Sequence, residues 1–332
     1  MNPSSIAGYL SALFLLPLAL AAQQPKQAAA PVQKNCWLRD ANSPAAATAY
    51  LLCEQGQMWV TTDAGATWTQ RNTGANSRLR AFSWVDASRG LVVGNGGLLL
   101  ATSDGGKTWQ PRDSGVQQHL MDITFIGESG WIAGYQGVIL HTADGGKTWA
   151  RQPTGTTMTL EGLFFLDADR GWAVGWSGTI LRTVDGGKTW NHVKTDASQW
   201  SLFAACFVDA DRGWVTGFAG QILRTTDGGA TWKRQDSPVK DSLTSISFDS
   251  SKRGWITYDD GLLVSEDNGE TWKPVSAGGR YFLSKLLAVD KTMWAVGQSA
   301  VLRQGGNGKE WKRINSLVAN GTATEVPISD RK

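Results

Sequence analysis

A six-residue box, Asp-x-Gly-x-x-Trp, recurs along this chain of 332 residues at an almost constant interval. A decayed seventh copy ends at Trp311 and has Gly306 in place of the aspartate. The tryptophans that close successive copies are 41, 40, 41, 42, 40 and 39 residues apart. Self-similarity at a period of about 40 residues is the signature of repeat architectures, so this feature restricts the fold more than any other. The six complete boxes begin at Asp63, Asp104, Asp144, Asp185, Asp227 and Asp267.

Each period contains four short strand patterns. Residues 160–190 show an apolar run, a polar turn, the strand GWAVG, a tight glycine turn, the strand TILRT, the box and a last strand opening at TW. No segment has a helical period. A four-stranded sheet cannot bury both of its faces alone, so successive sheets must stack on one another. The pattern therefore predicts an all-β fold, a seven-bladed β-propeller with four-stranded antiparallel blades over residues 36–315.

The boxes are predicted to be structural. An aspartate side chain accepts hydrogen bonds from the backbone amides of its own turn, and the following glycine adopts a left-handed conformation without steric cost. In this interpretation each box joins the third and fourth strands of a blade, and its tryptophan covers the blade edge. A phosphate-binding loop would need a following helix, which the sequence does not predict.

Both ends of the chain are expected to lie outside the blades. Residues 1–22 have an apolar run interrupted by Pro17, with Ala19 and Ala21 placed for cleavage, and they resemble a signal peptide. The run is short for a membrane span, so no stable insertion is expected after cleavage. Residues 23–35 predict a disordered leader, and residues 316–332 either a loose tail or a closing strand. Together they predict a periplasmic or secreted protein.

Export makes the cysteines informative. Cys36 and Cys53 bracket the first strands and are a candidate disulfide, which would tie the start of the fold to its first blade. The sequence leaves their pairing open because it does not define the distance between them. Cys206 lies in an apolar run and is predicted to be a small buried hydrophobic residue.

A turn with the pattern Asp-x-x-Arg-Gly joins the first two strands of three blades, and a fourth copy, residues 250–254, has Ser250 in place of the aspartate. Its arginine has two interpretations. Either it pairs with the aspartate of its own turn, or several such arginines form a ring of guanidinium groups that binds carboxylates, including the carboxyl end of a peptide. The arginines concerned are Arg89, Arg170, Arg212 and Arg253.

The turns between the second and third strands lie on the opposite face in this topology. Three neighbouring blades carry a large aromatic residue there, Tyr135, Trp176 and Phe218. These side chains either pack against the next blade or form an exposed apolar contact surface. Nearby loops add further residues to the same rim: Gln199, Trp200, Arg280 and Tyr281.

Composition excludes several functions. The formal net charge of +3 and the absence of a Lys/Arg run argue against a nucleic-acid surface. The histidines His119, His141 and His192 are scattered, so neither a metal nor a cofactor is predicted. A glycoside hydrolase needs paired carboxylates, whereas Asp122 and Glu161 are each explained as a lone polar residue at a channel entrance. No enzyme activity is therefore expected.

The run "DxDRGWAVGxxGxILRTxDGGKTW" is similar to the photosystem II stability and assembly factor family, seven-bladed propellers of the bacterial neuraminidase repeat type. The resemblance covers roughly residues 36–315. It implies a non-catalytic exported protein that binds a protein or peptide, such as a subunit of a membrane complex, during assembly. It also implies an arginine-rich contact surface, here at Arg89, Arg170, Arg212 and Arg253. Residues 128–130 lack the arginine of the turn, and residues 291–293 lack the whole turn.

Two alternatives to that function stay open from the sequence. One is a sialidase-like glycoside hydrolase, because Asp boxes also occur in such enzymes. The other is a secreted carbohydrate-binding protein that uses Tyr135, Trp176 and Phe218 as stacking platforms. A monomer is expected in each case.

Overall fold

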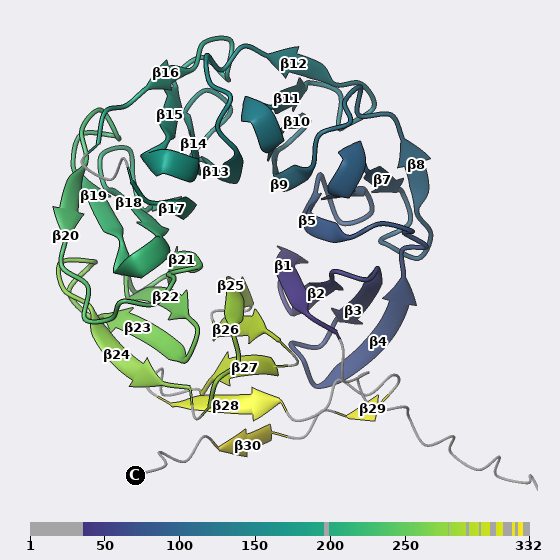
Figure 1. Cartoon of the computed structure of the whole chain (residues 1–332). Helices are drawn as coiled ribbons and strands as arrows, with labels where there is room; N and C mark the ends of the chain where they lie inside the picture. Colours follow the sequence, from purple (N-terminus) through teal and green to yellow (C-terminus); the bar gives the residue numbers. More distant parts are fainter. Residues whose placement is uncertain are drawn as a thin grey trace, which may run out of the picture.

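The computed structural model describes residues 36–195, 199–277, 279–289, 292–298, 300–305, 310–314, 321–322 and 325–327. The predicted signal peptide and leader, and Gly306 of the decayed box, lie outside these ranges. Seven antiparallel sheets stand around a central axis and close into a ring (Figure 1). The seven-bladed β-propeller predicted from the repeat period is confirmed.

Each blade takes four consecutive strands, ordered from the axis outward. Blade 1 consists of β1 (Leu38–Ala45), β2 (Thr48–Cys53), β3 (Gln57–Thr61) and β4 (Thr67–Asn72). Blade 2 consists of β5 (Leu79–Trp84), β6 (Gly90–Gly94), β7 (Leu99–Thr102) and β8 (Gln110–Arg112). Blade 3 consists of β9 (Leu120–Ile126), β10 (Ser129–Gly134), β11 (Ile139–Thr142) and β12 (Ala150–Gln152). Blade 4 consists of β13 (Leu160–Phe165), β14 (Gly171–Gly175), β15 (Ile180–Thr183) and β16 (Asn191–His192).

The remaining blades follow the same order. Blade 5 consists of β17 (Leu202–Phe207), β18 (Gly213–Gly217), β19 (Ile222–Thr225) and β20 (Lys233–Gln235). Blade 6 consists of β21 (Ser245–Phe248), β22 (Gly254–Tyr258), β23 (Gly261–Ser265) and β24 (Lys273–Ser276). Blade 7 consists of β25 (Leu283–Val289), β26 (Thr292–Gly297), β27 (Ala300–Gln304) and β28 (Trp311–Ile314). The outer strands β29 (Gly321–Thr322) and β30 (Glu325–Pro327) come last.

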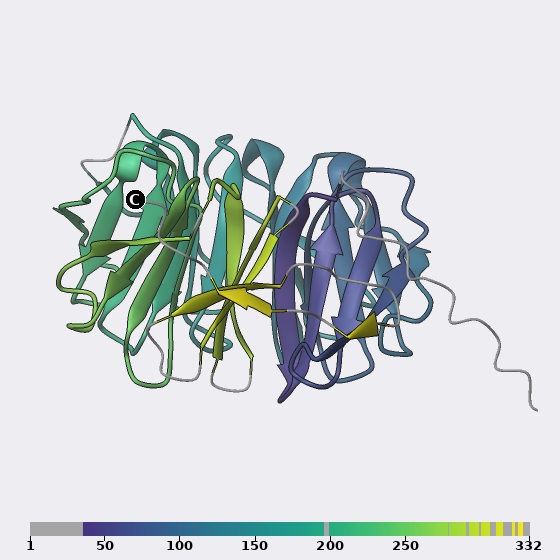
Figure 2. The same cartoon turned by 90° about the horizontal axis from the view of Figure 1, so that it is seen from below.

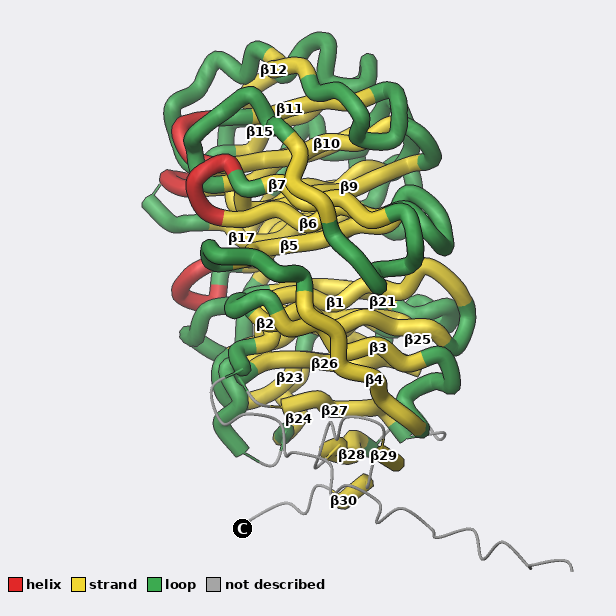
Figure 3. Tube along the Cα trace, turned by 90° about the vertical axis from the view of Figure 1, so that its right-hand side faces the viewer, coloured by secondary structure: helices red, strands yellow, loops and turns green. Residues whose placement is uncertain are grey.

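The two faces of the disc carry different connections. Four short 3-10 turns join the second and third strands of blades 2–5, and Figure 3 shows them on one side of the molecule. We call this side the helical-turn face; the connections between consecutive blades also lie there. The hairpins between the first two strands and the Asp boxes lie on the other side, the Asp-box face. The four turns are η1 (Asn95–Gly97), η2 (Tyr135–Gly137), η3 (Trp176–Gly178) and η4 (Phe218–Gly220).

The hydrophobic core lies between blades rather than at one centre. A typical cluster joins Trp172 and Val174 of blade 4 to Leu202, Phe207 and Val215 of blade 5. Neither face of a single sheet is buried by its own strands, so each blade needs its neighbour. A tryptophan near the start of the second strand fills this layer in five blades and is at most 2 % exposed: Trp131, Trp172, Trp214, Trp255 and Trp294.

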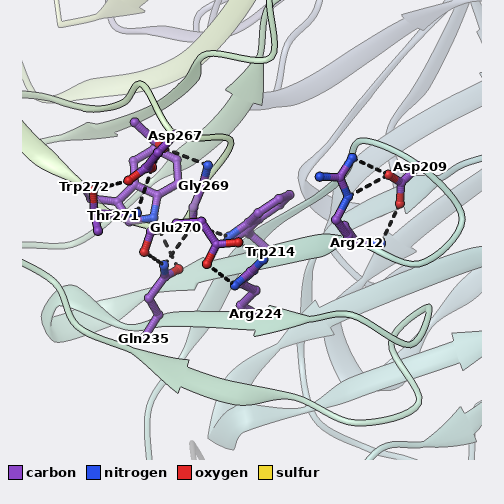
Figure 4. Close-up of polar contacts among 11 residues, drawn as sticks. Asp209, Arg212, Trp214, Arg224, Gln235, Asp267, Gly269, Glu270, Thr271 and Trp272 are labelled. Atoms are coloured by element: carbon purple, nitrogen blue, oxygen red, sulfur yellow. Dashed lines mark hydrogen bonds and ion pairs between the residues drawn. The ribbon is translucent and has the colours of Figure 1, made fainter.

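The Asp box both closes its own turn and joins two blades. In blade 6 the Asp267 carboxylate accepts a hydrogen bond from the Thr271 amide at 2.9 Å and one from the Thr271 hydroxyl at 2.5 Å. The carbonyl of Gly269 accepts a hydrogen bond from Trp214 Nε1 of blade 5 at 3.2 Å (Figure 4). The first contacts hold the turn and the second fixes the preceding blade against it. The box is therefore an inter-blade joint.

The ring closes with the same kind of contact that joins blades 6 and 7. The Ser284 hydroxyl of blade 7 donates to the Leu38 carbonyl of blade 1 at 2.7 Å, as Thr244 of blade 6 donates to Leu283 of blade 7 at 2.6 Å. Two short C-terminal strands lie on the outside at this seam: β29 pairs with β4 of blade 1, and β30 pairs with β28 of blade 7 (Figures 1 and 2). The sequence had left a tail and a closing strand as alternatives; within the described residues, both terminal blades gain an outer strand.

The first blade carries one covalent link. Cys36 and Cys53 form a disulfide with their Cα atoms 5.5 Å apart, joining the segment before β1 to the end of β2. Cys206 is a free thiol that is partly buried, and desolvation raises its pKa to about 12. Among the described residues no helix is long and apolar enough to cross a membrane.

Candidate functional site

The arginines of the inner hairpins lie on the Asp-box face and are held by carboxylates. Nε of Arg170 donates to Asp167 of its own turn at 2.7 Å, and Arg212 donates to Asp209 in the same way at 2.7 Å (Figure 4). Arg89 bonds both Asp86 and, from the next blade, Glu128 at 2.5–3.0 Å. Exposed ion pairs of this kind contribute little to stability, but they neutralise the guanidinium charge locally.

Arg253 differs from the other three. Its guanidinium lies 3.9 Å from Glu266, and its backbone amide donates to Asp249 at 3.1 Å. The four hairpin arginines therefore share one face, as the repeat pattern predicted, and each has an acidic neighbour. A ring of unpaired guanidinium groups is not what the geometry displays at this face.

The aromatic series lies on the helical-turn face, where Trp176 and Phe218 are exposed and Tyr135 is half-buried. Trp176 in η3 and Phe218 in η4 are 44 % and 47 % exposed. Tyr135 in η2 has its ring centroid 6.0 Å from that of Trp176, and Trp200 stacks on Phe218 at 5.6 Å. The rings thus form two contacting pairs along blades 3–5, and we call Tyr135, Trp176, Trp200 and Phe218 the aromatic arc.

Other apolar side chains extend this surface. Five large hydrophobic side chains are exposed among the described residues. Met158 and Phe282 belong to inter-blade connections on the helical-turn face, as Trp176 and Phe218 belong to its turns. Only Val184, beside an Asp box, lies elsewhere. An exposed apolar set confined to one side is typical of a contact surface.

A cavity of about 530 Å³ occupies the axis of the ring. In every blade its lining includes the residue that follows a leucine at or just before the start of the inner strand, and each of these leucines is at most 1 % exposed. In six blades a β-bulge lies at this point, and bulges re-aim a side chain. The seven residues that follow these leucines, six of them at bulges, form the mouth ring at the helical-turn face. They are Arg39, Arg80, Met121, Glu161, Phe203, Thr244 and Ser284.

The mouth ring is basic on one side. Arg39 and Arg80 come from blades 1 and 2, and neither forms an ion pair within the described part of the chain. The Nε of Arg80 donates to Asn95 at 2.9 Å. The Nε of Arg39 is buried and has no hydrogen-bond partner. Burial lowers the pKa of Arg39, and repulsion from the neighbouring Arg80 lowers it further.

Deeper in the cavity, charged groups serve the fold. The carboxylate of Asp40 accepts a hydrogen bond from the Phe82 amide of blade 2 at 2.9 Å. It also forms an ion pair with Lys285 of blade 7 at 3.0 Å. The carboxylate of Asp122 likewise accepts a hydrogen bond from the Leu163 amide of blade 4 at 2.8 Å. Desolvation raises the pKa of Asp122 to about 6. These groups act as inter-blade joints, and the sequence had placed Asp122 at the channel entrance instead.

Glu161 is the other acidic residue that the sequence placed at the entrance, and the structure places it in the mouth ring. Its Oε1 accepts a hydrogen bond from Trp176 Nε1 at 2.7 Å. It also lies close enough to Arg39 to act on that guanidinium electrostatically. Glu161 therefore connects the aromatic arc to the basic side of the mouth. No group of three His, Cys, Asp or Glu side chains able to hold a metal occurs among the described residues.

Sequence reasoning missed two features of this site. Arg39 and Arg80 each follow the leucine that opens an inner strand and are 41 residues apart, the period of the boxes. This shared position of Arg39 and Arg80 is present in the sequence, but it was not used to predict a site. The box itself extends two residues upstream, where a hydroxyl such as that of Thr225 donates to Asp227 at 2.7 Å and accepts the Gly229 amide at 2.9 Å.

These observations define the class of protein: a seven-bladed β-propeller whose regular joints form the scaffold and whose varied residues gather at one mouth. The sequence matches the model of the family described as "Photosynthesis system II assembly factor YCF48" over residues 63–163, 152–237 and 190–281. These matches span most of the chain, and the protein therefore belongs to this family.

Solved structures show the same fold. YCF48 from Cyanidioschyzon merolae is 24% identical, covers 76% of this chain and 90% of its own, and superposes with a TM-score of 0.63. The GH74 enzyme of Niastella koreensis is 14% identical over 89% of this chain and 54% of its own, with a TM-score of 0.69. The WD40 propeller of Doa1 is 9% identical over 85% of this chain and 98% of its own, with a TM-score of 0.70. No curated protein matches the chain.

Proposed function

We propose that this protein is an exported, non-catalytic propeller that binds a polypeptide through its helical-turn face and assists the assembly or stability of a membrane protein complex. It acts in the periplasm or outside the cell, as a monomer. Membership of a family described as an assembly factor supports a polypeptide as the ligand. The disulfide between Cys36 and Cys53 supports an oxidising compartment.

One observation carries the choice of face. Trp176 and Phe218 are exposed beside the mouth of the cavity, whereas Arg89, Arg170 and Arg212 on the other face already pair with carboxylates. Aromatic residues are the usual anchors of protein interfaces because they bury a large area with few rotatable bonds. A partner that lands on the helical-turn face gains apolar contact without first breaking an ion pair.

The experiment compares two double variants that alter opposite faces. Trp176→Ala/Phe218→Ala and Arg170→Ala/Arg212→Ala are used with the parent protein as baits on detergent-solubilised membranes. We expect the aromatic variant to lose the client and the arginine variant to retain it. Loss by the arginine variant alone would move the site to the Asp-box face, and identical client recovery by all three baits would contradict both assignments.

The glycan hypotheses have a direct test. A sialic-acid substrate, a xyloglucan substrate and a glycan array are applied to the parent protein. We expect neither turnover nor binding, because the carboxylates of Asp40 and Asp122 in the cavity are occupied in holding blades together. Hydrolysis that is lost in Asp122→Asn or Glu161→Gln would make the protein a glycoside hydrolase.

A further inference from the structure

We propose that the polypeptide partner places an acidic side chain in the channel mouth, between Arg39 and Arg80, beside an apolar residue held on the aromatic arc. This inference rests on the proposed function and adds the chemistry by which the partner is selected. It concerns the mouth ring rather than the hairpin arginines, which lie on the opposite face.

The first argument is an imbalance of charge. Arg39 and Arg80 are like charges on neighbouring blades, and no carboxylate of the described residues forms an ion pair with either. A third arginine, Arg78, stands beside them with a side chain 54% exposed, and Glu54 lies 3.4 Å from it. A carboxylate brought between the two mouth arginines relieves their repulsion and meets two guanidinium forks that suit its geometry.

The second argument is shape. The bulge after each opening leucine turns Arg39 and Arg80 into a cavity of about 530 Å³, which has room for a side chain. Lys285 and Asp40 are paired deeper in the same cavity and neutralise each other. An entering carboxylate therefore meets unpaired positive charge near the mouth and a closed ion pair beneath it.

The third argument joins the mouth to the arc. Glu161 accepts a hydrogen bond from the indole of Trp176 at 2.7 Å and lines the same cavity as Arg39, so the aromatic arc and the basic side border one cavity mouth. The rings of Trp200 and Phe218 stack on each other with centroids 5.6 Å apart, so each has one face already covered. This arrangement suits an apolar side chain packed against the pair better than a flat sugar ring. An acidic residue a few positions from an aromatic or aliphatic residue fits both parts.

Blade 6 adds a boundary to this recognition. Asp259 and Asp260 occupy its turn on the same face with Asp241 near them, and Arg280 pairs with Asp260, which leaves an excess of negative charge. Burial, followed by these neighbouring charges, raises the pKa of Asp259. An acidic segment is repelled from blade 6 and attracted to blades 1 and 2. The face therefore orients the partner as well as selecting it.

The test uses random dodecapeptides displayed on phage and selected on the full mature protein. The tightest peptide is synthesised with each Asp or Glu kept or replaced by its amide, and affinities are measured by fluorescence anisotropy. Arg80→Gln is compared with Arg170→Gln, which makes the same change of charge on the Asp-box face. Arg78→Gln, at an exposed position, serves if Arg80→Gln proves unfolded by circular dichroism.

We expect peptides enriched in acidic residues, with the acidic form binding about 10- to 100-fold more tightly than the amide form. Arg80→Gln should abolish that difference, and Arg170→Gln should preserve it. Peptides that bind the parent without acidic preference, or keep the preference in Arg80→Gln or in its substitute Arg78→Gln, overturn the inference and leave the proposed function standing. Failure to select any peptide overturns both.

Discussion

The Asp box makes a quantitative prediction at Gly229, the second glycine of the blade 5 copy. Gly229 has a φ of +76°, and a Cβ built there lies 2.2 Å from Nε1 of Trp172 in blade 4. Trp172 is 1 % exposed and packs on all sides, so it cannot move aside. A Gly229→Ala variant should therefore suffer both backbone strain and steric overlap.

The blade 2 copy separates these two contributions. Gly106 occupies the equivalent position with a φ of +77°, but its nearest neighbours would lie 3.4 Å from a new Cβ, an ordinary contact. In Gly106→Ala the free energy of unfolding should fall only by the cost of an alanine in the left-handed conformation, about 1–2 kcal/mol. In Gly229→Ala the free energy of unfolding should fall by a further amount of about 1–3 kcal/mol, which is typical of overpacking a core.

Urea unfolding followed by tryptophan fluorescence measures both losses on otherwise identical proteins. A further loss of about 2 kcal/mol corresponds to a melting temperature lower by roughly 4 °C for a domain of this size. Equal losses in the two variants would refute the reasoning, because they would show that the Trp172 contact does not constrain the joint. A smaller loss at Gly229 than at Gly106 would contradict the inter-blade role of the box altogether.

Three further predictions concern stability. Hydrogen bonds from the Thr231 side chain and amide lower the pKa of Asp227 to about 2. The Asp227 carboxylate therefore stabilises the fold above about pH 4, and this stabilisation is lost as the pH falls towards 2. The melting temperature should fall over this range, and less steeply in Asp227→Asn. Asp122 has a raised pKa, about 6, so its effect on stability has the opposite pH dependence. Its stabilising contribution is complete below about pH 4 and is lost as the pH rises through 6. The stability of the parent protein relative to Asp122→Asn should therefore decline between pH 4 and 7. The disulfide of Cys36 and Cys53 spans 17 residues, and Cys53→Ser should lower stability by about 3 kcal/mol; unchanged melting under dithiothreitol would contradict this.

Local contacts explain why much of the fold was predictable. The carboxylate of Asp227 bonds Thr225 and Thr231, two and four residues away, so each box is complete within its own turn. A motif that is satisfied locally keeps its spacing in every copy, and that spacing revealed the number of blades. The pairing of Arg170 with Asp167 was proposed for the same reason, since the two residues are three positions apart.

Other features depend on residues brought together from different blades. Arg89 bonds Glu128 at a separation of 39 residues, and the sequence offered no reason to join them. The mouth pair was missed although Arg39 and Arg80 share a register, because a register does not show which side chains a bulge turns inward. The closing strands β29 and β30 likewise pair across the seam between the first and last blades.

The repeat period was thus enough to establish seven four-stranded blades and a structural role for the boxes, since those depend on hydrogen bonds within a few residues and on the need of each sheet for a neighbour. The choice between the two faces required coordinates. Neutralisation of Arg89 by Glu128 and the contact between Tyr135 and Trp176 follow from how separate blades meet. Such meetings are set by packing across the ring, which no single repeat contains.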